Sequence, residues 1–237
     1  MAAPADATIQ DLSGTWVMDA TLSTPTDPIL QLQGMSWLTR KALSYATVTL
    51  SVTQYRDSEN KSLAHIDIDQ TLTGGIKGTT ETRITDWTER EHKDHIFGAV
   101  VGQTRLVRGS KGEDGKLRPK TEYQTKIGGN GVDDEKIQKF LNGEILPDGT
   151  ESEGWLLDPV GEDFGEGEGL FLQNWVRNID EGYGWTAEQI WGFENVDGKR
   201  QYTRRVVVAG KDGSYQLGRL VYNYQGPVQT TAETPAQ

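Results

Sequence analysis

Strict alternation of apolar and polar residues is the main pattern of this chain. Between Ala46 and Thr53 every second residue is apolar and the others are Thr or Ser, which predicts a strand with one apolar and one hydroxylated face. Further segments of this kind, separated by turn signals rich in Gly and Asp, lie at residues 64–74, 76–89, 94–109, 116–127, 188–196, 200–210 and 215–224. We therefore expect an all-β fold, a closed or nearly closed up-and-down antiparallel β-barrel.

Two segments break the alternation. Between Pro28 and Ser44 a cluster of apolar residues is interrupted by Gly34, which predicts two short helices that form a lid. Residues 144–168 contain nine acidic residues and no Lys or Arg, and a short helix is expected just before them, at 133–143. We interpret this region as one long acidic loop excursion near residues 130–170, part of which docks back on the barrel through Trp155 and helps to close its mouth.

The two ends of the chain are small, polar and punctuated by proline. We expect disordered tails at residues 1–11 and 226–237 and a single β-barrel domain at residues 12–225. A chain of 237 residues is long enough for one full hydrophobic core, so a second domain is not required.

Composition and charge exclude several classes of function. A formal net charge of −11 argues against a nucleic-acid partner, which needs a cationic surface. The chain has no cysteine, so disulfides and zinc–thiolate sites are excluded. No signal peptide, long apolar run or nucleotide-binding motif is visible, so we expect no membrane insertion, no cofactor and a cytoplasmic location. The sequence leaves open whether the protein forms a homodimer.

The opening strand resembles a known signature. In the stretch LSGTWVM, the residues Gly14, Thr15 and Trp16 are similar to the first-strand Gly-x-Trp of lipocalins and cytosolic fatty-acid-binding proteins. The resemblance implies an antiparallel barrel around a ligand cavity, and the expected helical lid is more similar to the fatty-acid-binding group. Those carriers hold a carboxylate with an Arg-x-Tyr pair, whereas this chain has Arg219 and Tyr222 separated by two residues, so they lie on opposite faces of a strand.

The chain is longer than a minimal carrier of this kind. In this respect it resembles the lipocalin-like cyclases of natural-product pathways, which carry out Diels-Alder-type ring closures without a cofactor. That resemblance implies a cofactor-free cyclase or isomerase acting on a hydrophobic, polycyclic or polyene, small molecule. The alternative is a non-catalytic carrier of the lipocalin or fatty-acid-binding kind, because a closed barrel alone binds ligands by apolar burial and a few polar anchors.

Ring closure of this kind needs no nucleophile. Holding the reacting ends together lowers the entropic part of the barrier, and one hydrogen-bond donor polarises an electron-poor partner. The candidate catalytic donors on the expected strands are Arg83, His95, Tyr202 and Arg204. His92 and His95 lie beside Asp94, but this pair lacks a third ligand, so we expect no metal site.

Flat aromatic side chains suit a pocket for a rigid or conjugated ligand, and a stripe of polar residues on one strand face suits the oxygens of such a ligand. A stripe of this kind either lines the cavity or faces solvent, and the sequence leaves both open. The candidate ligand-binding residues are Trp37, Arg40, His65, Asp67, Trp87, Phe97, Trp175, Trp185, Trp191 and Tyr222.

Overall fold

The computed structural model describes residues 1–74, 76, 78–128, 131–180 and 184–228. Its strands are β1 (Gly14–Met18), β2 (Val48–Arg56), β3 (Ala64–Leu72), β4 (Thr80–Ile84), β5 (Arg90–Asp94), β6 (Gly98–Lys111), β7 (Leu117–Pro119), β8 (Glu168–Asn178), β9 (Thr186–Val196), β10 (Lys199–Ala209) and β11 (Tyr215–Gly226). Its helices are α1 (Asp27–Leu32), α2 (Trp37–Leu43), α3 (Val132–Leu141) and the 3₁₀ turn η1 (Glu162–Phe164).

The strands form one curled antiparallel sheet in the order β4-β3-β2-β1-β11-β10-β9-β8-β6-β5, with β7 added beside β6. Strands that are adjacent in the sheet are also consecutive in the sequence, with two exceptions. Strand β1 pairs with β11, and β6 pairs with β8 because β7 lies off this path. The edge strands β4 and β5 line the same cavity, and just after β4 an isolated bridge joins Asp86 to Arg105 of β6. The expected antiparallel barrel-like β fold is confirmed.

Alternation along each strand divides the sheet into an inner and an outer face. The inner core joins Ile66 and Ile68 of β3 to Trp191 of β9 and Tyr202 of β10. Trp16 is fully buried in this core, its Nε1 donates to the carbonyl oxygen of Leu12 at 2.9 Å, and its ring contacts the ring of Tyr224.

The glycine of the Gly-x-Trp signature has a packing role. Gly14 has a φ of +143°, and a Cβ atom there would lie 2.5 Å from Cε2 of Tyr224. Only glycine has both the backbone freedom and the space for this approach. The signature therefore lets Tyr224 pack closely against β1.

The two short helices lie where the sequence predicts them, between β1 and β2. Gly34, with a φ of +81°, separates them. Ile29 of α1 is buried with Trp185, Val206 and Val208, so α1 covers one end of the barrel interior. By contrast, α2 contributes no buried residue.

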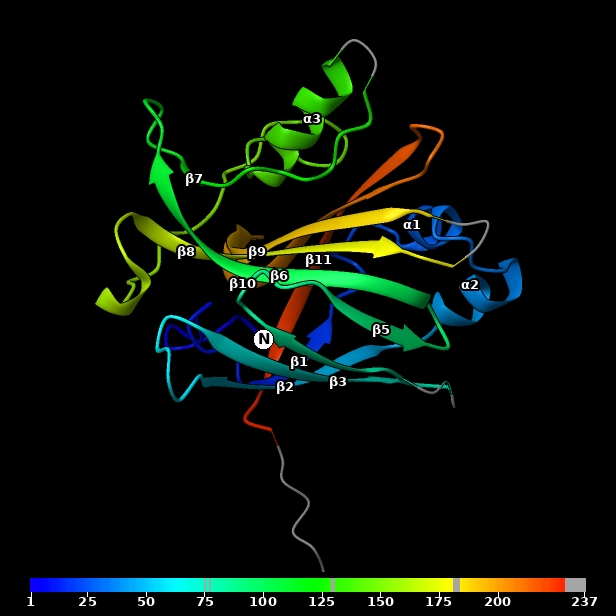
Figure 1. The fold of residues 1–237 in the computed structure, drawn as a ribbon, viewed down its shortest axis with the longest axis horizontal. Coiled ribbons are helices and arrows are strands. Elements are labelled where there is room, and N and C mark those ends of the chain that lie inside the picture. Colours follow the sequence, from blue (N-terminus) through cyan, green and yellow to red (C-terminus); the bar gives the residue numbers. More distant parts are fainter. Residues whose placement is uncertain (75, 77, 129–130, 181–183, 229–237) are drawn as a thin grey trace, which may run out of the picture.

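A second layer covers the outer face of β6 to β11. Helix α3 lies outside the sheet (Figure 1). Its Ile137, Phe140 and Leu141 pack against outward-facing residues such as Ile190 and Val207. Trp155 docks in the same cluster above Gly192, where a Cβ atom would lie 2.7 Å from its ring. Helix α3 and Trp155 therefore pack on the barrel wall, away from the mouth that the sequence interpretation had them close. Farther along the acidic segment, Leu156, Val160 and Phe164 pack against the inner core.

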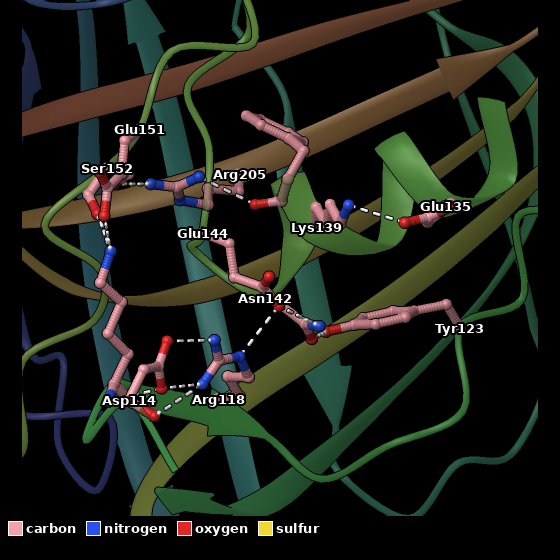
Figure 2. A network of polar contacts seen from close by, with 12 residues as sticks. Asp114, Arg118, Tyr123, Glu135, Lys139, Asn142, Glu144, Glu151, Ser152 and Arg205 are labelled. Carbon is pink, nitrogen blue, oxygen red and sulfur yellow. Dashed lines mark hydrogen bonds and ion pairs between the residues drawn. The ribbon is translucent and has the colours of Figure 1, made fainter. Parts of the chain in front are cut away.

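Polar contacts attach this layer to the barrel (Figure 2). Arg118 of β7 pairs with Asp114 and with Glu144, and Glu144 accepts a hydrogen bond from Asn142 after α3. Arg205 points outward from β10 and donates to the carbonyl oxygens of Phe140 and Ile145, at 2.8 and 2.5 Å. These bonds tie the C-terminal end of α3 and the loop after it to β10.

The N-terminal residues differ from the expected loose tail. Ala3, Ala7 and Ile9 are buried, and the amide of Ala3 donates to the carbonyl oxygen of Arg200 at 2.8 Å. Small apolar side chains allow this segment to pack against the inner core. The expected C-terminal tail at 226–237 falls outside the described residues from position 229 onward.

Candidate functional site

A cavity of about 530 Å³ lies inside the barrel, next to the two edge strands. Its apolar wall comes from β6, β8, β9 and the turn before β6, and consists of Phe97, Val100, Val176, Trp185 and Ala187. Its polar wall comes from β4 and β5 and includes Glu81, Arg83, Arg90, His92 and Asp94. Gln33, just after α1, borders it from the lid. This volume suits a small organic ligand.

The opening of the cavity lies between the edge strands. Every residue of β4 from Thr80 to Ile84 borders the cavity, so both faces of this strand meet it. Strand β5 likewise contributes Glu91, from its outer face, together with His92 from its inner face. Because an uninterrupted wall would present only one face of each strand, the cavity opens to solvent between β4 and β5.

Arg83 is the central polar group of the cavity. Register with β3 places Arg83 opposite Ile66 and Glu81 opposite Ile68, so both side chains point inward. The guanidinium of Arg83 donates to the Glu81 carboxylate and to Oδ1 of Asn174 on β8. Thr104 of β6 donates to the same amide oxygen at 3.0 Å. These contacts fix the orientation of Arg83.

A second buried arginine lies beside this group. The guanidinium carbon of Arg204 is 3.8 Å from the centroid of the Trp191 ring, within range for a cation–π contact. Its Nε donates to the hydroxyl of Tyr202 at 2.8 Å, and the ring of Tyr222 lies 5.2 Å away. Trp191 in turn donates from Nε1 to Gln189, which borders the cavity.

Several donors around the cavity have no acceptor. Nε of Arg83, Nδ2 of Asn174 and Nη2 of Arg204 are buried and lack a hydrogen-bond partner among the described residues. A buried donor without a partner costs about 1–3 kcal/mol, so native proteins seldom leave three together. An oxygen-bearing ligand would satisfy them.

The arginines also set the charge of Glu81. Burial opposes its ionisation, but the nearby Arg83 and Arg204 outweigh burial, and the pKa of Glu81 is below its usual value of 4.5. The 27% of its side chain that is accessible borders the cavity. Burial also raises the pKa of Tyr202 and of Tyr222, so both hydroxyls stay protonated at neutral pH.

The candidate catalytic residues fall into two groups. Arg83 borders the cavity, and Tyr202 and Arg204 are buried just behind it, in contact with each other. His95 is exposed in the turn between β5 and β6 and is not among the residues that line the cavity.

The candidate ligand-binding residues are more scattered. Phe97 and Trp185 line the cavity, and Trp191 and Tyr222 adjoin it through Arg204. The others lie away from the cavity. Trp37 is exposed on α2, Trp87 stacks on Arg105, and Trp175 faces outward near Arg177. The three polar candidates have partners of their own: Arg40 pairs with Asp27, His65 pairs with Asp57, and Asp67 accepts a hydrogen bond from Thr82.

Sequence reasoning did not select several residues of this site. Glu81 shares a strand face with Arg83, and that period of two was the available signal. Asn174 and Gln189 carry no local signal, because pairing with distant strands decides that they face inward.

The fold and the cavity define a barrel-like β protein with an internal site for a small molecule. Two curated proteins resemble the chain over nearly all of its length. It is 26% identical over 226 residues to "Probable pericyclase scpY" of Mollisia scopiformis, covering 95% of this chain and 96% of that protein. It is 25% identical over 227 residues to "Pericyclase pydY" of Acremonium sp., covering 96% and 98%. The resemblance to cyclases is thereby confirmed.

Solved structures similar to the chain include a REP1-NXSQ fatty acid transporter, with 11% identity, a TM-score of 0.42, and 90% of this chain and 96% of that chain covered. The wild-type fluorescent protein UnaG has 11% identity, a TM-score of 0.43 and the same coverage. No protein-family model matches. Within the described residues, every helix is too short or too polar to cross a membrane.

Proposed function

We propose that this protein is a cofactor-independent cyclase of the pericyclase type. It binds a hydrophobic polyene that carries a carbonyl group and folds the chain of that polyene into the conformation that closes a ring. The observation that carries the proposal is that one cavity has an apolar wall, with Phe97 and Trp185, and is bordered by Arg83, whose buried Nε is unpaired and lies beside the unpaired Nδ2 of Asn174. The two relatives named as pericyclases support the same reaction class.

Each wall has a separate task in this mechanism. The apolar wall holds the diene and excludes water, and confinement brings the two reacting ends together, which supplies the entropic part of the rate enhancement. Arg83 and Asn174 donate hydrogen bonds to the carbonyl oxygen, withdraw electron density from the adjacent double bond and make it a better partner for the diene. The lack of a nucleophile or cofactor motif agrees with this chemistry.

Arg204, behind the cavity, acts on the shape of the cavity. Arg204 contacts Trp191 and Tyr202, both of which lie on the inner face of the barrel. A rigid aromatic surface restricts the ligand to few conformers, and the conformer that is held decides which diastereomer forms. We therefore treat Arg204 as a positioning residue and Arg83 as the residue that contacts the ligand.

A synthetic triene ketone, 1,7,9-decatrien-3-one, tests the proposal because it cyclises slowly and without chiral preference in buffer. With the protein present, we expect faster formation of the bicyclic ketone and an excess of one enantiomer, measured by chiral gas chromatography. Arg83→Met removes the donor and should lower the rate by about 100-fold while binding, followed by tryptophan quenching, persists.

The matched control is Arg177→Met, which removes a guanidinium from the outer face of β8, where it pairs with Glu89. This control should keep the rate and the enantiomeric excess. Binding of the triene with racemic product at the buffer rate would instead identify the protein as a carrier.

A further inference from the structure

His92 and Asp94 form a polar pair on the rim of the cavity that ring closure does not use. Register with β6 places His92 opposite Val100 and Asp94 opposite Gly98, so both side chains extend from the inner face of β5. Both border the cavity. They come from the sequence REHKDH, which lacks a third metal ligand.

The geometry of this pair suits proton transfer. Nε2 of His92 is buried and has no hydrogen-bond partner among the described residues, while Oδ2 of Asp94 lies 3.3 Å away in a direction unsuited to a hydrogen bond. Oδ1 of Asp94 accepts from the amides of Ile96 and Phe97, at 2.6 and 2.7 Å, which fixes the carboxylate. Asp94 is therefore positioned to stabilise the imidazolium that forms when His92 takes up a proton.

His92 also connects the cavity to water. Its side chain is 40% exposed although Nε2 is buried, so the imidazole reaches from the rim of the cavity to solvent. On the other edge strand, Glu81 borders the same cavity.

The unpaired donors lie at the other edge strand and behind it: Arg83 of β4 borders the same cavity as His92, and Asn174 contacts Arg83. A carbonyl oxygen bound by Nε of Arg83 and Nδ2 of Asn174 would place its neighbouring carbon in the cavity that His92 borders. A base and a cationic donor that border the same cavity can remove a proton next to a carbonyl, because the donor stabilises the charge that develops on oxygen.

We propose that the site also enolises ketones and thereby exchanges or inverts the carbon next to the carbonyl. Nε2 of His92 accepts the proton as the C–H bond breaks, and the electron pair moves onto the carbonyl oxygen, which Arg83 and Asn174 hold as an enolate. The proton, or one exchanged from solvent, then returns to carbon from His92 and restores the ketone. Neither oxidant nor cofactor takes part. This inference rests on the binding of a carbonyl ligand in the proposed function, but not on ring closure.

The probe is cis-1-decalone, a bicyclic ketone with exchangeable hydrogens beside the carbonyl. In D₂O, the full-length protein should speed deuterium incorporation, measured by mass spectrometry, and convert the cis to the trans isomer. General base catalysis of this kind accounts for roughly 100-fold or more. His92→Gln should lose most of the enhancement, with His92→Asn as the second variant, and tryptophan quenching reports binding in every sample.

The matched control is Lys93→Gln, which changes the next residue on the exposed outer face of β5 and should exchange deuterium at the wild-type rate. Binding of decalone without exchange above buffer would overturn this inference and leave the proposed cyclase standing. Exchange that persists in both His92 variants would overturn the assignment of His92. Failure to bind decalone at all would overturn this inference and the ketone-binding part of the proposed function together.

Discussion

Arg205 and Glu194 form an ion pair in which Nη2 and Oε2 are 2.7 Å apart and the two side chains are 0% and 1% exposed. Each is further bound: Thr203 donates to Glu194 at 2.7 Å, and Arg205 donates to Ser152 at 2.8 Å. Burial opposes the ionisation of Glu194, but Arg205 outweighs it, so the pKa of Glu194 is below 4.5. The pair joins the barrel to its outer layer.

Breaking this pair should destabilise the protein strongly. Glu194→Gln leaves the buried guanidinium of Arg205 without a counter-ion, which costs about 3–5 kcal/mol in the free energy of unfolding. Urea denaturation followed by tryptophan fluorescence measures it. Lys139→Met, which breaks the exposed pair of Lys139 with Glu135, is the control and should change stability far less. Equal effects of the two variants would show that Arg205 relaxes to water.

Removing Phe140 should separate stability from binding. This side chain is fully buried in the outer layer and does not border the cavity. Phe140→Ala is expected to lower the free energy of unfolding by about 3–5 kcal/mol through loss of apolar burial and the resulting void. Below its unfolding temperature, the variant should bind decalone with wild-type affinity by tryptophan quenching. Weaker binding would mean that the outer layer shapes the cavity.

Filling the cavity should abolish binding without harming the fold. Gly102 of β6 borders the cavity, and a Cβ atom there would meet only Val176 and Trp175, at 3.6 and 3.8 Å, which is ordinary contact. Gly102→Leu should therefore fold, with equal or greater thermal stability because glycine weakens a strand, and its affinity for decalone should fall at least ~10-fold. Unchanged affinity would place the ligand elsewhere.

Stability at acid pH should depend on Asp57. A hydrogen bond with His65 at 2.9 Å, together with the amides of Asn60 and Glu59, lowers the pKa of Asp57 from 3.8 to about 2. Because the folded state favours the carboxylate, the stabilisation is complete above 3.8 and is lost as the pH falls toward 2. Asp57→Asn should flatten the decline of the melting temperature between these values. Carbon-detected NMR titration of Asp57 gives the pKa directly.

The sequence predicted where the strands lie, but it did not predict which face of each strand points into the barrel. In β3 the alternation of Ile66 and Ile68 with His65 and Asp67 identified the strand, yet either face is compatible with a barrel. The structure turns the isoleucines inward because they join the inner core around Trp16. The cavity needs Arg83 and Asn174 from strands far apart in the chain, and such pairing is decided by the whole sheet and not by any local pattern.

The outer layer had a signal that was not used. In β10 the run from Val206 to Ala209 is apolar at every position, although a strand with one solvent face would alternate. Such a run indicates a strand that is covered on both sides. Val206 and Val208 pack under the lid, whereas Val207 packs against α3. The helix at 133–143 was predicted, but only this apolar run indicated that the helix would lie on the outer wall of the barrel.

The outer layer gives the barrel an unequal stiffness. Strands β8, β9 and β10 are held between two cores, whereas β4 and β5 have free edges and border the opening. We therefore expect thermal motion to concentrate in β4 and β5, where the wall has one layer, and the aromatic wall of the cavity to keep its shape. A molecule would then enter and leave by local opening of two short strands, without disturbing the surface against which it is held.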